Sequence, residues 1–300
     1  MTGKSIFVIF FLYLITGCVT QKEISGKIDI PNSIFEYTAE GNGIPCVAFT
    51  GSENLGHRLY SEKFRNKFLL IHADPSQLDS TMVSTLTVDM ILDDIEKVRK
   101  ALNLPQIAVI GHSMFGTLPL DYALKYPQKI SYSISTGSKP SRAKKYKDII
   151  KDYWETNASD ERKEVYTKNM EEFSKLNMNK LTPTQKFVKY YTANIPRFCF
   201  DLQFDMSEFW GDTEINMDFL DHFRKELSTY DNSAKYKTIS TPVLVISGRH
   251  DYSAPYVLWG EIKNENPSLT FHVFDNSGHN PSIEIPEQFD DFVIQWLYRN

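Results

Sequence analysis

The stretch that decides the fold is residues 107–116, which read IAVIGHSMFG. Its first four residues form a short apolar run of the length of a buried strand, and a glycine on either side of Ser113 marks a tight turn. A strand that turns sharply into a helix, with a serine at the turn, is typical of a nucleophile elbow. We expect a helix that begins at Met114 and directs the positive end of its dipole at an oxyanion beside Ser113.

Seven further apolar runs around this stretch predict strands. They lie at residues 24–30, 34–39, 45–50, 68–73, 130–136, 242–247 and 269–274. Apolar residues recur at helical spacing over 92–102 and 118–124, and again after Pro286. Alternating strands and helices predict an α/β fold in which a mostly parallel, eight-stranded sheet carries helices on both faces.

One long segment interrupts this alternation. Residues 138–236 show only helical periodicity, so we expect an all-helical cap inserted into a core made of residues 34–137 and 237–300. Long insertions in compact domains are usually lids or binding elements, although this one could also be a purely structural excursion.

Two more polar residues follow predicted strands in the same manner as Ser113. Asp251 comes shortly after residues 242–247, and His279 comes shortly after residues 269–274. The carboxyl ends of parallel strands meet at one edge of a sheet, where open α/β folds bind their ligands. A serine hydroxyl becomes a good nucleophile when a histidine takes its proton and a carboxylate orients that histidine. We therefore predict a catalytic triad of Ser113, Asp251 and His279.

These motifs resemble the α/β-hydrolase superfamily over residues 34–299. The resemblance implies a serine hydrolase whose oxyanion hole uses two backbone N–H groups, one from Met114 and one from Ser52 or Gly51. The chain departs from the usual Gly-x-Ser-x-Gly pattern because Phe115 occupies the place of the second glycine. Either the elbow opens slightly to accommodate Phe115, or the residues that face it are small.

Capped relatives of this kind include esterases and proline iminopeptidases. We expect a small-molecule acyl substrate, preferably a carboxylic ester, and a proline iminopeptidase-like activity is the alternative. That alternative would use acidic residues of the cap, namely Asp201, Asp205 and Glu208, to hold a substrate ammonium group. The plainer interpretation of the same acidic stretch, which we favour, is a solvated helix face. A third hypothesis is a non-catalytic binding lipoprotein that retains the fold.

The N-terminus predicts a signal peptide over residues 1–17, because Lys4 precedes an apolar run that ends at Thr16-Gly17-Cys18. This ending resembles the lipobox of bacterial lipoproteins, which implies a lipid on Cys18 and a polar tether over 18–33. Val19 favours the outer membrane of the cell envelope by the same resemblance. An uncleaved anchor helix is the alternative, although the apolar run is shorter than a membrane span requires.

The whole composition excludes other classes of partner. A formal net charge of −5, with no long block of one sign, gives no reason to expect nucleic acid as a partner. Cys46 and Cys199 lie in apolar surroundings, so we expect two buried free thiols in preference to a disulfide. We expect no metal and no cofactor, because three cysteines are too few for a metal framework.

Overall fold

The computed structural model describes residues 26–300, and the predicted signal peptide, Cys18 and the first part of the tether lie outside this range. The described chain forms one eight-stranded sheet in the order β1-β2-β4-β3-β5-β6-β7-β8. The strands are β1 (Gly26–Ile28), β2 (Glu36–Gly41), β3 (Ile44–Phe49), β4 (Phe68–Asp74), β5 (Ile107–His112), β6 (Ile130–Thr136), β7 (Val243–Gly248) and β8 (Leu269–Phe274). The predicted strand count and the α/β class are confirmed.

Two antiparallel pairings stand at one edge of this sheet. The strand β2 pairs antiparallel with both β1 and β4, whereas every pairing from β4 through to β8 is parallel. Parallel neighbours need crossover connections, which here are mostly helical. The carboxyl ends of β5, β6, β7 and β8 consequently lie at the same edge of the sheet.

Alternate residues of the central strands pack into separate cores on the two faces. In β3, Val47 and Phe49 pack on one face, and Cys46 and Ala48 pack on the other. The same alternation runs through β5 and β7, so both faces are apolar and both are covered. Cys46 and Cys199 are buried free thiols, as predicted.

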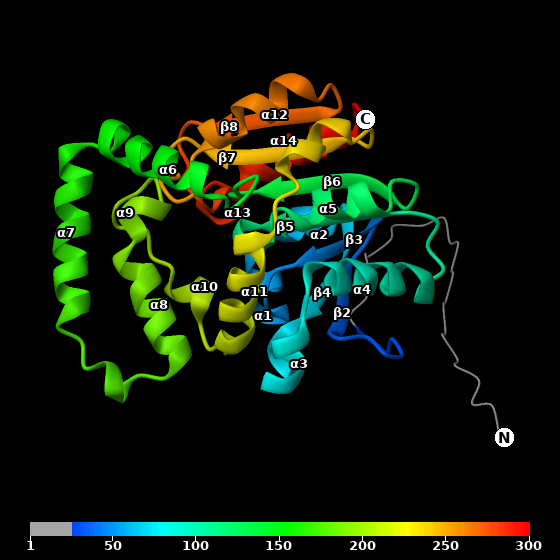
Figure 1. Ribbon diagram of the computed structural model, residues 1–300, viewed down its shortest axis with the longest axis horizontal. Helices are drawn as coiled ribbons and strands as arrows, with labels where there is room; N and C mark the ends of the chain where they lie inside the picture. Colours follow the sequence, from blue (N-terminus) through cyan, green and yellow to red (C-terminus); the bar gives the residue numbers. More distant parts are fainter. Residues whose placement is uncertain (1–25) are drawn as a thin grey trace, which may run out of the picture.

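Helices α4 (Val88–Ala101) and α5 (Leu118–Lys125) cover the first face, and α2 (Glu62–Arg65) and α14 (Pro286–Leu297) cover the second (Figure 1). In α14, Phe289, Val293 and Trp296 recur at helical spacing and are buried against the sheet. The shorter helices outside the cap are α1 (Glu53–Leu59), α3 (Ser80–Thr85), α12 (Gly260–Glu265) and α13 (Pro281–Glu284).

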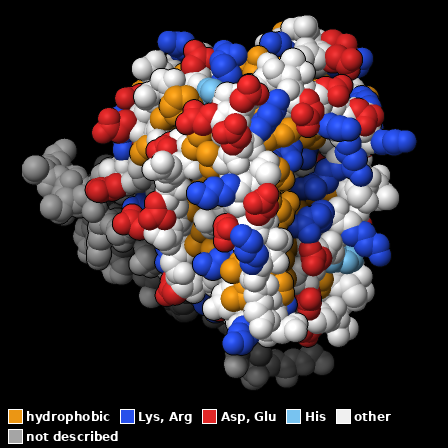
Figure 2. Space-filling model, turned by 90° about the vertical axis from the view of Figure 1, so that its left-hand side faces the viewer, with side chains coloured by type: hydrophobic (Ala, Val, Ile, Leu, Met, Phe, Trp, Pro, Cys, Tyr) orange, Lys and Arg blue, Asp and Glu red, His pale blue; other side chains and the backbone are white. Residues whose placement is uncertain are grey.

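The segment between β6 and β7 is helical throughout its regular elements, which confirms the inserted cap. Its helices are α6 (Lys144–Asn157), α7 (Asp160–Ser174), α8 (Pro183–Ala193), α9 (Ile195–Phe198), α10 (Ser207–Trp210) and α11 (Met217–Thr229). Figure 1 shows α6 to α9 gathered beyond one end of the sheet. On the face of the molecule seen in Figure 2, acidic, basic and apolar side chains are interspersed. Within residues 26–300, no helix is both long enough and apolar enough to cross a bilayer.

Candidate active site

Ser113 lies at the sharp turn that follows β5. Its φ of 55° lies in the left-handed region, which costs a non-glycine residue about 1 kcal/mol or more and is maintained here by the surrounding structure. A Cβ added to Gly111 would overlap the backbone oxygen of Phe115, and one added to Gly116 would overlap Ser138. Gly111 therefore allows the close approach of strand and turn that the sequence indicated, and Gly116 allows the turn to approach the loop after β6.

The helix after the elbow begins later than predicted. Residues 113–115 form a single 3₁₀ turn, and α5 starts only at Leu118. Pro119 lies in the first turn of α5, where its missing N–H costs no hydrogen bond. The prediction that a helix dipole starts at Met114 is wrong, and only local backbone N–H groups remain to face an oxyanion.

Phe115 is buried because its ring is turned into an apolar group of aromatic side chains. Its centroid lies 5.0 Å from that of Phe49 and 5.4 Å from that of Phe223, a residue of the cap helix α11. Gly51 also faces the ring, since a Cβ added there would lie 3.4 Å from it. The side chain that replaces the usual glycine thus ties the elbow to the cap.

We expect Phe115→Ala to destabilise the protein by about 3 kcal/mol, because truncating a buried phenylalanine leaves a cavity. Urea unfolding measures the effect, with Phe200→Ala as the matched control because Phe200 is 42% exposed. Equal midpoints for the two variants would contradict a packing role for Phe115.

His279 connects Ser113 to Asp251. Its Nε2 lies 2.8 Å from Ser113 Oγ, and its Nδ1 lies 2.7 Å from Asp251 Oδ2. Asp251 is completely buried, and its other oxygen accepts hydrogen bonds from the backbone N–H groups of Ser253 and Ala254. The structure thus brings together the three residues that were predicted from separate strands. Their hydrogen bonds give Ser113 the position of a nucleophile, His279 that of a base and Asp251 that of an orienting acid.

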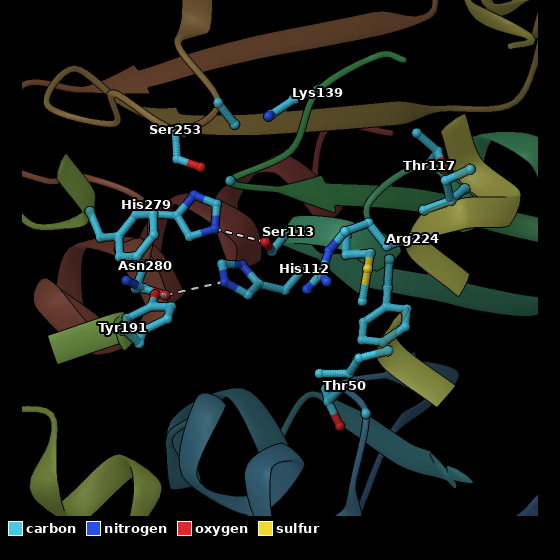
Figure 3. A pocket seen from close by; sticks show the side chains of 18 of the residues that line it. Thr50, His112, Ser113, Thr117, Lys139, Tyr191, Arg224, Ser253, His279 and Asn280 are labelled. Atoms are coloured by element: carbon cyan, nitrogen blue, oxygen red, sulfur yellow. Dashed lines mark hydrogen bonds between the residues drawn. The ribbon is translucent and has the colours of Figure 1, made fainter. Parts of the chain in front are cut away.

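A cavity of about 420 Å³ opens directly over Ser113 (Figure 3). Its apolar wall comes mainly from cap aromatics, which are Phe187, Tyr190, Tyr191, Phe198, Phe209 and Trp210. The volume is that of a site for a small or medium molecule. The cap therefore covers Ser113 and limits the size of the molecules that can reach it.

The predicted oxyanion hole is only partly at this cavity. Met114 and Gly51 line it, whereas Ser52 is buried behind them at the start of α1, where its hydroxyl caps the helix by accepting from the Leu55 N–H.

The loop that carries His279 is held by a residue that the sequence analysis did not identify. The partly buried Glu284 carboxylate accepts hydrogen bonds from the backbone N–H groups of Gly278 and Asn280, on either side of His279, and from that of Phe200 in the cap. Burial raises the pKa of Glu284, and these donors oppose the rise. No motif signals this role, because it depends on backbone contacts of a residue in a short helix.

A second histidine lies beside the first, with ring centroids 5.1 Å apart. His112 Nε2 lies 3.2 Å from Asn280 Oδ1, which also accepts a hydrogen bond from the Tyr191 hydroxyl of the cap (Figure 3). Burial, followed by the charge of nearby His279, lowers the pKa of His112 to about 3. His112 is therefore neutral at neutral pH and acts as a link between elbow, histidine loop and cap.

This pKa gives stability a defined pH dependence. In the unfolded chain His112 takes up a proton near pH 6.5, whereas the folded protein resists protonation down to about pH 3. The contribution of neutral His112 to the free energy of unfolding is thus fully present above pH 6.5, and it is lost as the pH falls below that value. We expect His112→Gln to flatten the acid side of the stability curve by up to about 1 kcal/mol per pH unit. Urea midpoints measured between pH 4 and 8 test this, and parallel curves for the two proteins would refute it.

The acidic residues of the cap are not at the cavity, which corrects the prediction for them. Asp201, Asp205 and Glu208 are exposed, and none of them lines the space above Ser113. The Asp201 and Asp205 carboxylates accept hydrogen bonds from backbone N–H groups two residues further along, as is usual in surface turns. The apolar residues interleaved with them face inward and leave the acids on the solvated side.

Within residues 26–300, one group of side chains has the spacing of metal ligands, namely Glu40, His57 and His72. Both histidines hydrogen bond to Glu40 Oε1, and Arg65 Nε lies 3.5 Å from Glu40 Oε2. Burial would raise the pKa of Glu40, but the hydrogen bonds from His57 and His72 outweigh it and lower the pKa to about 2. With a guanidinium already beside the carboxylate, the group is better suited to an ion-pair network than to a cation.

Comparisons with known proteins agree with this fold. A family model described as alpha/beta hydrolase fold matches residues 53–286. The chain is 26% identical to the AB hydrolase superfamily protein YclE of Bacillus subtilis, over 87% of this chain and 94% of that protein. It is also 26% identical to a proline iminopeptidase of Heyndrickxia coagulans, over 88% of this chain and 95% of that protein.

Solved structures show the same fold. An alpha/beta fold family hydrolase from Bacillus anthracis superposes with a TM-score of 0.67 at 21% identity, over 91% of this chain and 99% of that one. A proline iminopeptidase from Mycobacterium smegmatis gives a TM-score of 0.62 at 16% identity, over 92% and 98% of the two chains. An esterase from Exiguobacterium antarcticum gives a TM-score of 0.56 at 19% identity, over 92% of this chain and 100% of the esterase.

Proposed function

Because this chain belongs to the α/β-hydrolase family, we propose that it is a serine hydrolase that cleaves a small or medium carboxylic ester through an acyl-enzyme on Ser113. One observation carries the proposal: Ser113 and His279 line a cavity, and hydrogen bonds connect Ser113 through His279 to the buried Asp251. The reaction class follows from these residues and not from the fold alone.

In the proposed reaction, His279 Nε2 takes the proton of Ser113 as its oxygen attacks the ester carbonyl. The imidazolium is stabilised by buried Asp251. The resulting oxyanion faces the backbone N–H groups of Met114 and of Gly51 or Ser52. When the tetrahedral intermediate collapses, His279 returns the proton to the departing alcohol. A water molecule then attacks the acyl-enzyme with His279 again as base, which releases the acid and restores Ser113.

The charge of the cavity favours ester chemistry over aminopeptidase chemistry. An aminopeptidase of this type must pair the free α-amine of its substrate with a carboxylate. Among residues 26–300, no aspartate or glutamate lines the cavity, and the three predicted acids of the cap are exposed elsewhere. The similarity to proline iminopeptidases keeps their activity as the second candidate.

Side-by-side assay of simple esters and aminoacyl arylamides tests the choice. We expect esters with short or medium acyl chains to have the higher kcat/KM, and Asp201→Asn and Asp205→Asn to leave their hydrolysis unaffected. An arylamide that outperforms every ester, and loses its advantage when its amine is acetylated, would transfer the proposal to the aminopeptidase.

We further propose that Cys18 carries a lipid that anchors the mature protein in a bacterial envelope, at the outer membrane. The support is the apolar run before Thr16-Gly17-Cys18. Growth with a palmitate analogue should label the wild type but not Cys18→Ser, which should also leave the membrane fraction. Continued labelling and membrane association of Cys18→Ser would instead indicate an uncleaved anchor.

A further inference from the structure

The cavity over Ser113 has an unbalanced charge. Three cationic side chains line it, Lys139, Arg142 and Arg224, and among residues 26–300 no carboxylate does. Lys139 and Arg142 lie in the loop that leaves the carboxyl end of β6, next to the elbow, and Arg224 comes from cap helix α11. In Figure 3 the Arg224 guanidinium extends toward Ser113 and His112, and Lys139 lies on the other side of Ser113.

Other semi-buried cations of this protein have structural partners. The guanidinium of Arg162 donates to the backbone oxygens of Pro196, Cys199 and Phe200, and that of Arg58 donates to the carbonyl of Trp210 and the carboxylate of Asp212. These arginines fasten cap segments together or to the core. Their positive charges are satisfied by groups that belong to the fold.

Lys139 and Arg142 have no such partners. Within residues 26–300, no carboxylate lies within ion-pairing distance of either side chain, and neither donates a hydrogen bond to another residue. Arg224 differs from these two, because its side chain is 47% exposed and pairs with Asp221 one turn earlier on α11. Burial, and then repulsion by Arg142, lowers the pKa of Lys139 to about 8. Burial, and then repulsion by Arg224, lowers that of Arg142 as well.

Like charges gathered in a partly desolvated cavity cost free energy that the fold itself does not recover. A bound anion would recover it through charge-assisted hydrogen bonds, which are stronger than those between neutral groups. The cations line the same cavity as the nucleophile, so one molecule of modest size can carry both the anion and the scissile carbonyl.

We propose that Lys139 and Arg142, with Arg224 from the cap, bind an anionic group of the substrate, so that the preferred substrates are esters bearing a carboxylate or a phosphate. This inference rests on the proposed ester hydrolysis and names its substrate class. The cap aromatics form the apolar side of the cavity and the cations form the polar side. A substrate with one apolar arm and one anionic arm satisfies both.

The test compares matched pairs of esters on the purified protein. A p-nitrophenyl hemiester of glutaric acid is paired with p-nitrophenyl valerate, which places the anion on the acyl side. A carboxyphenyl butyrate is paired with phenyl butyrate, which places it on the leaving group. An acylglycerol phosphate paired with the corresponding monoacylglycerol distinguishes phosphate from carboxylate. We expect at least one pair to show a preference of about tenfold or more in kcat/KM for the anion.

The variant Lys139→Met/Arg142→Met should lose that preference, because the anion then enters a site without its donors. Lys151→Met, which changes an exposed lysine of α6 outside the cavity, should retain it. The double variant is expected to fold, since replacing unpaired buried charges by apolar groups relieves repulsion, and its thermal midpoint checks this.

Equal kcat/KM within every pair, or an anion preference that survives in the folded double variant, would overturn the inference while leaving ester hydrolysis intact. Failure of the wild type on all esters, neutral and anionic, would instead overturn the proposed function on which it rests.

Discussion

Ser113→Ala is expected to lower kcat on the best ester by a factor on the order of 10⁵ to 10⁶, because it removes the atom that attacks the carbonyl. The remaining activity would come from substrate binding and from backbone donors that polarise the ester. The cavity and the His279–Asp251 pair stay in place, so the folded state should be unaffected.

Steady-state kinetics on purified wild type and variant measure this effect. Ser253→Ala is the matched control, because its hydroxyl is removed from the same cavity while the backbone N–H that supports Asp251 remains. We expect that control to stay within about tenfold of the wild type. A comparable loss in both variants would show that the cavity is merely perturbed and that Ser113 has no special role.

Asp251→Asn is expected to lower kcat by a factor on the order of 10⁴, the second largest effect. The asparagine can present its amide N–H to His279 Nδ1, which fixes the tautomer whose Nε2 carries a proton and cannot act as a base. It also removes the buried negative charge that stabilises the imidazolium. The backbone donors of Ser253 and Ala254 still find an amide oxygen, so little change in folding is expected.

Asp275→Asn supplies the control for Asp251→Asn. Asp275 follows β8 and pairs with Arg249, but its side chain is 70% exposed, and surface ion pairs contribute little. The kcat of Asp275→Asn should match that of the wild type within about twofold. If Asp251→Asn also kept near wild-type kcat, the buried carboxylate would have a purely structural role.

The features that could be predicted from the sequence depend on strong local patterns. Each triad residue follows an apolar strand, and the carboxyl ends of parallel strands lie at one edge of the sheet. Ser113, Asp251 and His279 could therefore be placed at that edge from the positions of the predicted strands along the chain. The sheet could be predicted in the same way, because short apolar runs such as those of β5 and β7 are typical of strands that are buried on both faces.

The features that could not be predicted depend on tertiary contacts. Pro119 and the 3₁₀ turn delay the helix after the elbow, although the apolar spacing alone suggested an earlier start. Lys139 and Arg224 are 85 positions apart in the chain, and only the tertiary fold brings both of them to the lining of one cavity. The acids at Asp201 and Asp205 formed a conspicuous cluster in the sequence, yet they lie outside the cavity, because charge composition does not specify which side of a segment is solvated.

The central claim is that Ser113 is a base-activated nucleophile, and active-site labelling tests it most directly. The purified protein is treated with a fluorophosphonate probe and digested, and the modified peptide is sequenced by mass spectrometry. The account predicts rapid stoichiometric modification of Ser113, blocked in Ser113→Ala and strongly slowed in His279→Ala, because only a serine with a base and an oxyanion hole reacts quickly. No modification of the wild type, or equal modification of the wild type and Ser113→Ala, would contradict it.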